Sequence, residues 1–311
     1  MRSPLLLSCL AATCLAAVTS AADVDSGRLV LEKGDVITVV GNTFAERMIH
    51  YPHLEASLHA THPEHELVFR NLAWSGDEVA LQPRPLNFGT MDDYIRQTGA
   101  DVLVGCFGMN ESFGGYEGVP KFRKDLGQWL DEHQAMTING KQPVVVLVGP
   151  IAHENLGPPL PDGRERTHVL SRYRDVMREE ALRHGALFVD LLRPTRRAMA
   201  GEGGPYTING IHPNDKGYRL SATAFAEQVG LPARVGSAEP GTVDPLIDAI
   251  KARNTLFFQR WRPTNTEYVY GRRHKPYGNE NFPSERLELD RLVIEADENI
   301  HAIAKSQAVS R

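Results

Sequence analysis

Short apolar runs alternate with longer amphipathic segments between residue 30 and about residue 230. The apolar runs predict strands buried on both faces, as in a parallel sheet: Val36–Val40, Leu67–Arg70, Val102–Cys106, Val144–Val148 and Leu187–Asp190. The segments between them have helical spacing and predict helices over Phe44–Ala60, Met91–Thr98, Val119–Gln134, Arg166–His184 and Asn214–Val229. This alternation predicts an α/β protein, a three-layer α/β/α sandwich with a parallel sheet.

A second pattern follows after residue 230. The segment Gly230–Thr242 is rich in Pro and Gly and predicts a linker. Beyond it, apolar residues recur at helical spacing from Val243 to Phe258 and again from Leu289 to Ile303. We therefore expect one domain over residues 28–230 and a C-terminal helical extension over 243–311.

The first 21 residues have the composition of a secretory signal peptide. Arg2 precedes an apolar run from Leu5 to Val18, and Thr19-Ser20-Ala21 resembles a cleavage site. The run is too short for a stable transmembrane helix. We expect cleavage near Ala21 and export to the periplasm or the outside of the cell. The exported chain would keep a single cysteine, Cys106, so it can form no intramolecular disulfide.

Charge and composition restrict the kinds of partner and cofactor that the protein is expected to bind. The 311 residues carry a formal charge of -5, which argues against a nucleic-acid partner. Gly105-x-x-Gly108 lacks the glycine pattern and the lysine of phosphate loops. A group of histidines is better explained as a solvated face than as a metal site, because it has neither cysteines nor an H-E-x-x-H pattern: His50, His53, His59, His62 and His65. No cofactor or metal is expected.

Candidate chemistry lies where strands are predicted to end. The first strand stops at Gly41, and Asn42 and Thr43 follow at the start of a helical pattern. This position is the carboxyl edge of a parallel sheet, where ligands bind in open α/β folds. Three further segments follow in order: Asn71-Leu-Ala-Trp-Ser-Gly76, Gly108-Met-Asn110-Glu111 and Asn209-Gly-Ile-His212-Pro. Together they hold a hydroxyl, an imidazole and amide donors, the groups that ester cleavage requires.

These four segments resemble the four sequence blocks of the SGNH (GDSL-type) hydrolase superfamily, and the resemblance covers roughly residues 30–230. It implies a flavodoxin-like fold and an ester hydrolase that needs no cofactor. Thr43 takes the nucleophile position, and His212 takes that of the general base. The backbone N–H groups of Thr43 and Gly76 and the side chain of Asn110 would form the oxyanion hole. Asn209 stands where the family has an acid that orients the histidine.

The chain departs from the family pattern at three positions. Asn42 replaces an Asp, and Thr43 replaces a Ser, which adds a methyl group and restricts χ1. Asn209 replaces the triad Asp, and an amide cannot stabilise an imidazolium by charge. Asp190 and Asp215 are alternative acids, between which the sequence does not choose. A dyad in which a backbone carbonyl orients the histidine is a further alternative.

Each candidate also has a purely structural interpretation. Thr43 suits a helix N-cap, Asn110 could cap or close a loop, and His212 could lie in a surface turn. Gly76 could serve only a turn with positive φ. Cys106 is expected to be a small buried apolar residue.

The sequence therefore supports two hypotheses. The first is an exported ester hydrolase that removes a small acyl group, with a carbohydrate as the substrate that the family resemblance implies. The alternative is a catalytically weakened module that binds a glycan or a partner protein. Trp, Tyr and Arg residues between Arg260 and Arg273 suit either a contact surface or, as we favour, a connection that pins the extension to the domain. The extension could also supply part of the wall of the active-site cleft.

Overall fold

The structure is a computed structural model that describes residues 27–85, 87–235, 244–262, 272–276, 278 and 280–309. The predicted signal peptide lies outside the described residues, as do most of the predicted linker and of the segment after Arg262. None of the helices in the described ranges combines the length and apolar composition needed to cross a bilayer.

Five parallel strands form one sheet, as predicted. They are β1 (Val36–Gly41), β2 (Val68–Asn71), β3 (Val102–Cys106), β4 (Val144–Val148) and β5 (Leu187–Val189), in the order β2-β1-β3-β4-β5. This is the flavodoxin-like order, in which the direction of winding reverses between β1 and β3. The register places Gly41, the last residue of β1, beside Cys106, the last residue of β3. The segments that leave these two strands therefore start side by side.

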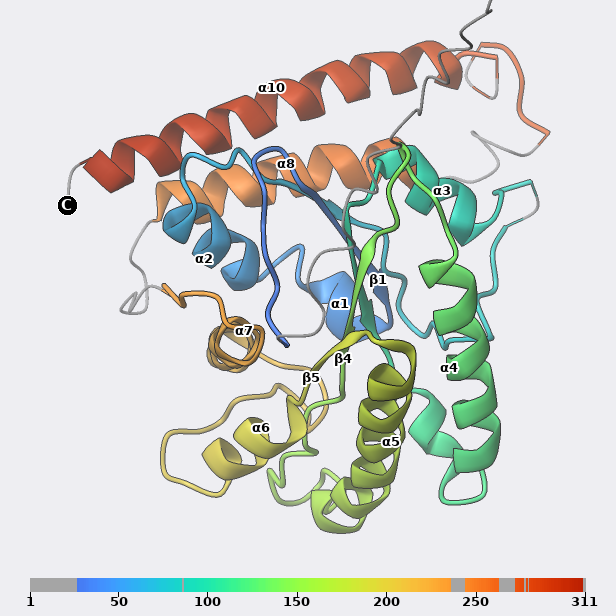
Figure 1. The fold of residues 1–311 in the computed structure, drawn as a ribbon, viewed down its shortest axis with the longest axis vertical. Coiled ribbons are helices and arrows are strands. Elements are labelled where there is room, and N and C mark those ends of the chain that lie inside the picture. Colours follow the sequence, from blue (N-terminus) through green and yellow to red (C-terminus); the bar gives the residue numbers. More distant parts are fainter. Residues whose placement is uncertain are drawn as a thin grey trace, which may run out of the picture.

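Helices cover both faces of the sheet (Figure 1). The first part of the chain contains α1 (Thr43–Arg47), α2 (His53–Thr61), α3 (Met91–Thr98), the short 3₁₀ helix η2 (Glu111–Gly114) and α4 (Val119–Gln134). The later part contains α5 (Gly163–His184), α6 (Leu192–Met199), α7 (Asp215–Gln228), α8 (Pro245–Trp261) and α10 (Phe282–Val309). In Figure 1, α2 and α7 lie on one side of the sheet, and α3 and α4 lie on the other.

Alternation along the strands explains the three layers. In β3, Val102, Val104 and Cys106 belong to an apolar cluster that includes residues of α2 and α7, while Leu103 belongs to a second cluster with α3, α4 and α5. Because successive side chains of a strand point to opposite faces, a continuous apolar run fills both clusters at once. The predicted three-layer fold is confirmed.

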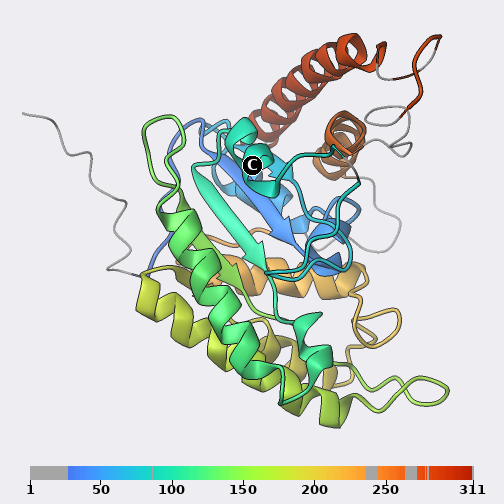
Figure 2. The same cartoon turned by 90° about the vertical axis from the view of Figure 1, so that its right-hand side faces the viewer.

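The C-terminal extension is a pair of helices packed against the domain. Figures 1 and 2 show α8 and α10 next to each other at one end of the molecule. Leu246 and Ile250 of α8 and Ile300 and Ala304 of α10 form a small apolar cluster with Ala56 of α2. The extension is thus anchored on α2, the second of the two helices between β1 and β2.

Three local predictions were wrong. The single helix expected over Phe44–Ala60 is divided into α1 and α2, because Pro52 cannot donate a backbone hydrogen bond and occupies the N-cap position of α2. Helix α6 was not predicted; it is only eight residues long, and five of them are Arg, Thr or Pro. The expected solvated histidine face is only partly so, since His53 and His59 are buried. His53 contacts Asp215 at 2.7 Å, and His59 packs against Phe69.

Candidate active site

A glycine and an asparagine shape the turn that carries Thr43. Gly41 has φ +121°, and a Cβ atom there would collide with the carbonyl oxygen of Cys106, so only glycine fits. Asn42 is buried, and its Oδ1 accepts a hydrogen bond from the N–H of Phe44 at 3.1 Å. The side chain of Asn42 therefore caps α1, and Thr43 is the first helical residue. The N-cap interpretation of Thr43 was wrong, and its hydroxyl is left for another role.

His212 lies in a loop that fixes its tautomer. Its Nδ1 lies 3.0 Å from Oδ1 of Asn209. The same Oδ1 accepts the backbone N–H of His212 at 3.1 Å, which identifies this amide atom as the oxygen. Nδ1 must then carry the proton and donate it. Nε2 keeps its lone pair, as a general base requires.

The two alternative acids lie elsewhere. Asp190 pairs with Arg174 at 2.6 Å and accepts the N–H of Leu192 at the start of α6. Asp215 pairs with His53 and Arg219. Within the described residues, neither carboxylate is hydrogen-bonded to His212. Asn209 is the side chain that orients it.

Glu154 was not singled out from the sequence, and it holds the histidine loop. Its buried carboxylate accepts hydrogen bonds from the N–H of Tyr206 and from both the N–H and the hydroxyl of Thr207. The N–H of Glu154 in turn donates to the carbonyl of Gly210 at 2.8 Å. Because Glu154 lies in the loop after β4, it ties this loop to the segment that carries Asn209 and His212. Nothing in the local sequence distinguishes it from a surface glutamate.

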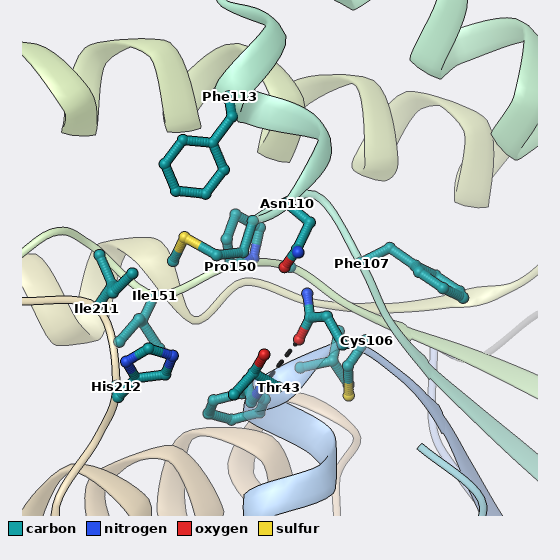
Figure 3. Close-up of a pocket in the computed structure, with 14 residues that line it drawn as sticks. Thr43, Cys106, Phe107, Asn110, Phe113, Pro150, Ile151, Ile211 and His212 are labelled. Carbon is teal, nitrogen blue, oxygen red and sulfur yellow. Dashed lines mark hydrogen bonds between the residues drawn. The ribbon is translucent and has the colours of Figure 1, made fainter. Parts of the chain in front are cut away.

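Asn110 follows β3 and opens η2. It stands at the N-cap position, but its side chain makes no capping hydrogen bond. In Figure 3 its amide points into the pocket, toward the side where Thr43 lies. The capping interpretation of Asn110 is therefore wrong, and its side-chain amide is oriented toward the pocket.

Glu111, the next residue, links two loops. One carboxylate oxygen accepts the N–H of Val79 at 3.0 Å, and the other accepts the N–H of Gly108 at 2.8 Å. Burial raises the pKa of Glu111 to about 7. The segment that carries Gly76 is thereby fastened to the segment that carries Asn110. The sequence brought Glu111 to attention only as the neighbour of Asn110.

Gly76 lies in a turn next to the end of β1. The N–H of Trp74 donates to the carbonyl of Gly41 at 3.0 Å, and the N–H of Asp77 donates to the carbonyl of Trp74 at 3.0 Å. Gly76 has φ +88°, so the turn itself requires glycine. Gly76 is not among the residues that line the pocket described next. Its expected donor role therefore rests on the position of its turn beside the end of β1, from which α1 starts.

One pocket of about 230 Å³ brings together Thr43, Asn110 and His212 at the carboxyl ends of β1 and β3. The imidazole of His212 and the hydroxyl of Thr43 face each other across it (Figure 3). Both residues are described, and no direct hydrogen bond joins them. The remaining lining is mostly apolar: Phe44, Phe107, Met109, Phe113, Val148, Pro150, Ile151 and Ile211, with Asn42, Cys106 and Gly149.

The electrostatics favour a neutral imidazole. Burial lowers the pKa of His212 below its usual value of 6.5, and the positive charge of Arg47 lowers the pKa further. His212 is therefore uncharged at neutral pH. Cys106 is buried as expected, and burial raises the pKa of its thiol to about 12, so it is no thiolate nucleophile. Within the described ranges, no group of three or more His, Cys, Asp or Glu side chains is arranged to hold a metal ion.

The fold and the pocket together define an α/β domain with a site at its topological switch point. The sequence profile of the GDSL-like Lipase/Acylhydrolase family matches residues 34–220, and the chain therefore belongs to this family. The resemblance to SGNH (GDSL-type) hydrolases is confirmed at this level. None of the curated proteins compared with the chain matches it.

Solved structures share the fold. Axe2, an acetylxylan esterase from Geobacillus stearothermophilus, superimposes with a TM-score of 0.53 at 16% identity, over 67% of this chain and 100% of its own. A GDSL-like lipase from Parabacteroides merdae gives 0.52 at 19% identity, over 66% and 100%. The gut microbial diltiazem-metabolizing enzyme BT4096 gives 0.52 at 17%, over 66% of this chain. The chain spans about half (49%) of the length of BT4096.

Proposed function

We propose that the protein is an exported ester hydrolase in which Thr43 is the nucleophile and His212 the general base. The observation that carries this proposal is the meeting of Thr43, Asn110 and a tautomer-fixed His212 around one pocket. Membership of a hydrolase family supports the reaction class. These three groups come from parts of the chain that are far apart in sequence. Purely structural roles for the three residues would not require them to meet at one pocket.

The reaction follows from the orientation of the groups. Nε2 of His212 takes the proton of the Thr43 hydroxyl as Oγ1 attacks the ester carbonyl carbon. The imidazolium then returns the proton to the leaving alkoxide, which leaves an acyl group on Thr43. Water, deprotonated by His212 in the same way, attacks this acyl-enzyme and releases the acid and free Thr43.

An oxyanion forms in both halves of the reaction. We assign its stabilisation to the backbone N–H groups of Thr43 and Gly76 and to the side-chain amide of Asn110. The N–H of Thr43 lies in the first turn of α1, where backbone donors lack an intrahelical acceptor. Loss of one such donor typically lowers kcat by about 10²- to 10³-fold.

The size and lining of the pocket support the proposal that it binds a small acyl group of the substrate. Its volume is about 230 Å³, and aromatic and aliphatic side chains form most of its lining. Phe113 is 66% exposed, so its ring remains accessible to a substrate at the pocket. A carbohydrate leaving group is proposed by analogy with the acetylxylan esterase that shares the fold.

Asn209 favours the second candidate function, a binding module with little or no turnover. The comparable Asp-to-Asn change in a serine protease lowers kcat by about 10⁴-fold. We favour hydrolysis because the amide donor and the histidine base are both retained at the pocket.

The test is hydrolysis of p-nitrophenyl acetate, butyrate and octanoate by the purified protein. Thr43→Ala and His212→Ala should each lower kcat/KM at least 100-fold for every ester, because each removes a reacting group. Thr255→Ala and His168→Ala change exposed residues of α8 and α5 and serve as matched controls. Equal rates for the wild type and the Thr43 and His212 variants would refute the hydrolase. Binding of acetylated xylo-oligosaccharides without turnover would support the binding module.

A further inference from the structure

One arginine of the C-terminal extension, Arg262, contacts both of the active-site turns. This residue caps the C-terminus of α8, where its N–H donates to the carbonyl of Phe258 at 2.8 Å. It lies more than forty positions beyond residue 220, where the family match ends. Its partners are nevertheless residues of the two segments that carry Thr43 and Gly76.

The first contact is an ion pair with the nucleophile helix. Nη1 of Arg262 donates to Oε1 of Glu46 at 2.6 Å, and both side chains are less than one-fifth exposed. Glu46 belongs to α1, three residues after Thr43. Its other oxygen, Oε2, accepts hydrogen bonds from the N–H of Ser75, at 2.7 Å, and from the Ser75 hydroxyl. Glu46 thus joins Arg262, α1 and the residue before Gly76.

The second contact is with Trp74, at the start of the same turn. The guanidinium carbon of Arg262 lies 3.6 Å from the centroid of the Trp74 ring, within the range of a cation–π interaction. The buried ring of Trp261 meets Trp74 edge-on, with centroids 6.0 Å apart. A guanidinium that is both paired with a carboxylate and stacked on an indole has little orientational freedom.

Trp74 transmits this constraint to the turn. Its N–H is bonded to Gly41, and its carbonyl accepts the N–H of Asp77. Arg84 also lies over the Trp74 ring, at 4.5 Å, and pairs with the buried Asp77. Without Arg262, Glu46 would lose its ion pair to the end of α8, and Trp74 would keep its edge-on contact with Trp261 but lose the stacked guanidinium.

We propose that Arg262 is a positioning residue for catalysis: by binding Glu46 and Trp74 it holds the Gly76 turn in register with the Thr43 helix. The extension is then part of the catalytic unit. Oxyanion donors act through their preorganised placement, so a turn that shifts by a fraction of an ångström loses transition-state stabilisation while binding the substrate as before. The catalytic consequence rests on the proposed hydrolase function.

The experiment compares Arg262→Met with Arg260→Met. Arg260 lies on the same helix end but pairs with Asp290 of α10, at 2.6 Å, and so serves as the matched control. We expect Arg262→Met to lower kcat for p-nitrophenyl acetate at least tenfold with KM changed less than twofold. Arg260→Met should keep the kcat and the KM of the wild type. Arg262→Lys should restore only part of kcat, because an ammonium keeps the charge but not the planar stacking.

Glu46→Gln is a second variant, which weakens the ion pair with Arg262 from the side of the domain. Arg262→Met combined with Glu46→Gln should be no slower than the slower single variant, since both break one connection. Wild-type kcat in Arg262→Met, or an equal loss in Arg260→Met, would overturn the proposal.

Hydrogen exchange separates this proposal from the hydrolase function. The amides of residues 72–79 should exchange at least fivefold faster in Arg262→Met than in Arg260→Met, with or without esterase activity. If the wild type has no esterase activity but Arg262→Met still exchanges faster, Arg262 holds the turn and the hydrolase function is rejected. Unchanged exchange and unchanged kcat in an active enzyme would reject the positioning role alone.

Discussion

Asn209 is the residue that departs most from the catalysis proposed for this site. It performs the geometric task of a triad acid, because its Oδ1 accepts both the Nδ1 proton and the backbone N–H of His212. It cannot perform the electrostatic task, because a neutral amide gives the imidazolium formed during attack no countercharge. Burial and the positive charge of Arg47 also lower the pKa of His212, so they too disfavour the imidazolium. The surroundings of His212 thus favour the neutral imidazole.

The Asn209→Asp variant tests this account. A carboxylate 3 Å from Nδ1 should stabilise the imidazolium and raise kcat at least tenfold. In the wild type, kcat/KM should fall with decreasing pH through a midpoint below 6.5, because the pKa of His212 is lowered. In the variant this midpoint should move upward, because a neighbouring negative charge raises the pKa of histidine.

The measurement is a pH–rate profile from pH 4.5 to 9. Asn139→Asp, at an exposed turn, is the matched control and should leave the profile unchanged. A faster Asn209→Asp enzyme with an unmoved midpoint would show that the carboxylate does not act on His212.

At the level of elements, the site depends on loops that are fastened to one another. Glu111 joins the Gly76 and Asn110 segments, and Glu154 joins the loop after β4 to the histidine loop. In both cases one carboxyl group accepts hydrogen bonds from backbone N–H groups of a different loop. Such residues escape sequence analysis because Val79 lies 32 positions from Glu111 and Thr207 lies 53 positions from Glu154.

The Glu111→Gln variant has a pH-dependent effect on stability. Since the pKa of Glu111 is raised from 4.5 to about 7 in the folded protein, the folded state holds a proton that the unfolded state releases. Its contribution to the free energy of unfolding is therefore complete below pH 4.5 and falls by about 3 kcal/mol as pH rises to 7. Glutamine does not titrate.

Urea unfolding at pH 5 and pH 8 provides the measurement. The wild type should exceed Glu111→Gln by about 2.5 kcal/mol more at pH 5 than at pH 8. Glu117→Gln, at an exposed position of the same segment, is the control. A difference between wild type and Glu111→Gln that does not vary with pH would contradict the raised pKa.

At the scale of the whole molecule, a buried ionic cluster fastens the extension to the domain. The fully buried Arg253 of α8 donates to Glu55 of α2 and to the carbonyl of Phe69 in β2. Asp297 of α10 lies 3.6 Å from Arg253 and 2.6 Å from Arg70 of β2. Four elements thus meet at compensating charges, and the apolar contacts of α8 and α10 surround them.

The Arg253→Met variant should lower the free energy of unfolding by about 3–5 kcal/mol, because it leaves the buried Glu55 carboxylate without its partner. Arg291→Met, at an exposed arginine of α10 that pairs with Glu288 and Glu295, should cost less than about 1 kcal/mol. Chemical denaturation checks both values. Equal stabilities of the two variants would mean that the buried cluster does not hold the extension.

The pattern of the chain alone determined the main fold. Continuous apolar runs such as Val102–Cys106 and Val144–Val148 can be buried on both faces only in a covered parallel sheet, and both strands were predicted to the residue. The same pattern located Thr43, Asn110 and His212 at strand ends or their exit loops, because polar residues after buried strands gather at one sheet edge.

Only the tertiary structure decided how these residues are supported. It selected Asn209 over Asp190 and Asp215 as the partner of His212, and it brought Arg262 to Glu46 across 216 positions of sequence. The physical reason is range. The periodicity of strands and helices depends on residues that are close in sequence. The partner of a buried charge depends instead on which surfaces meet when the layers pack.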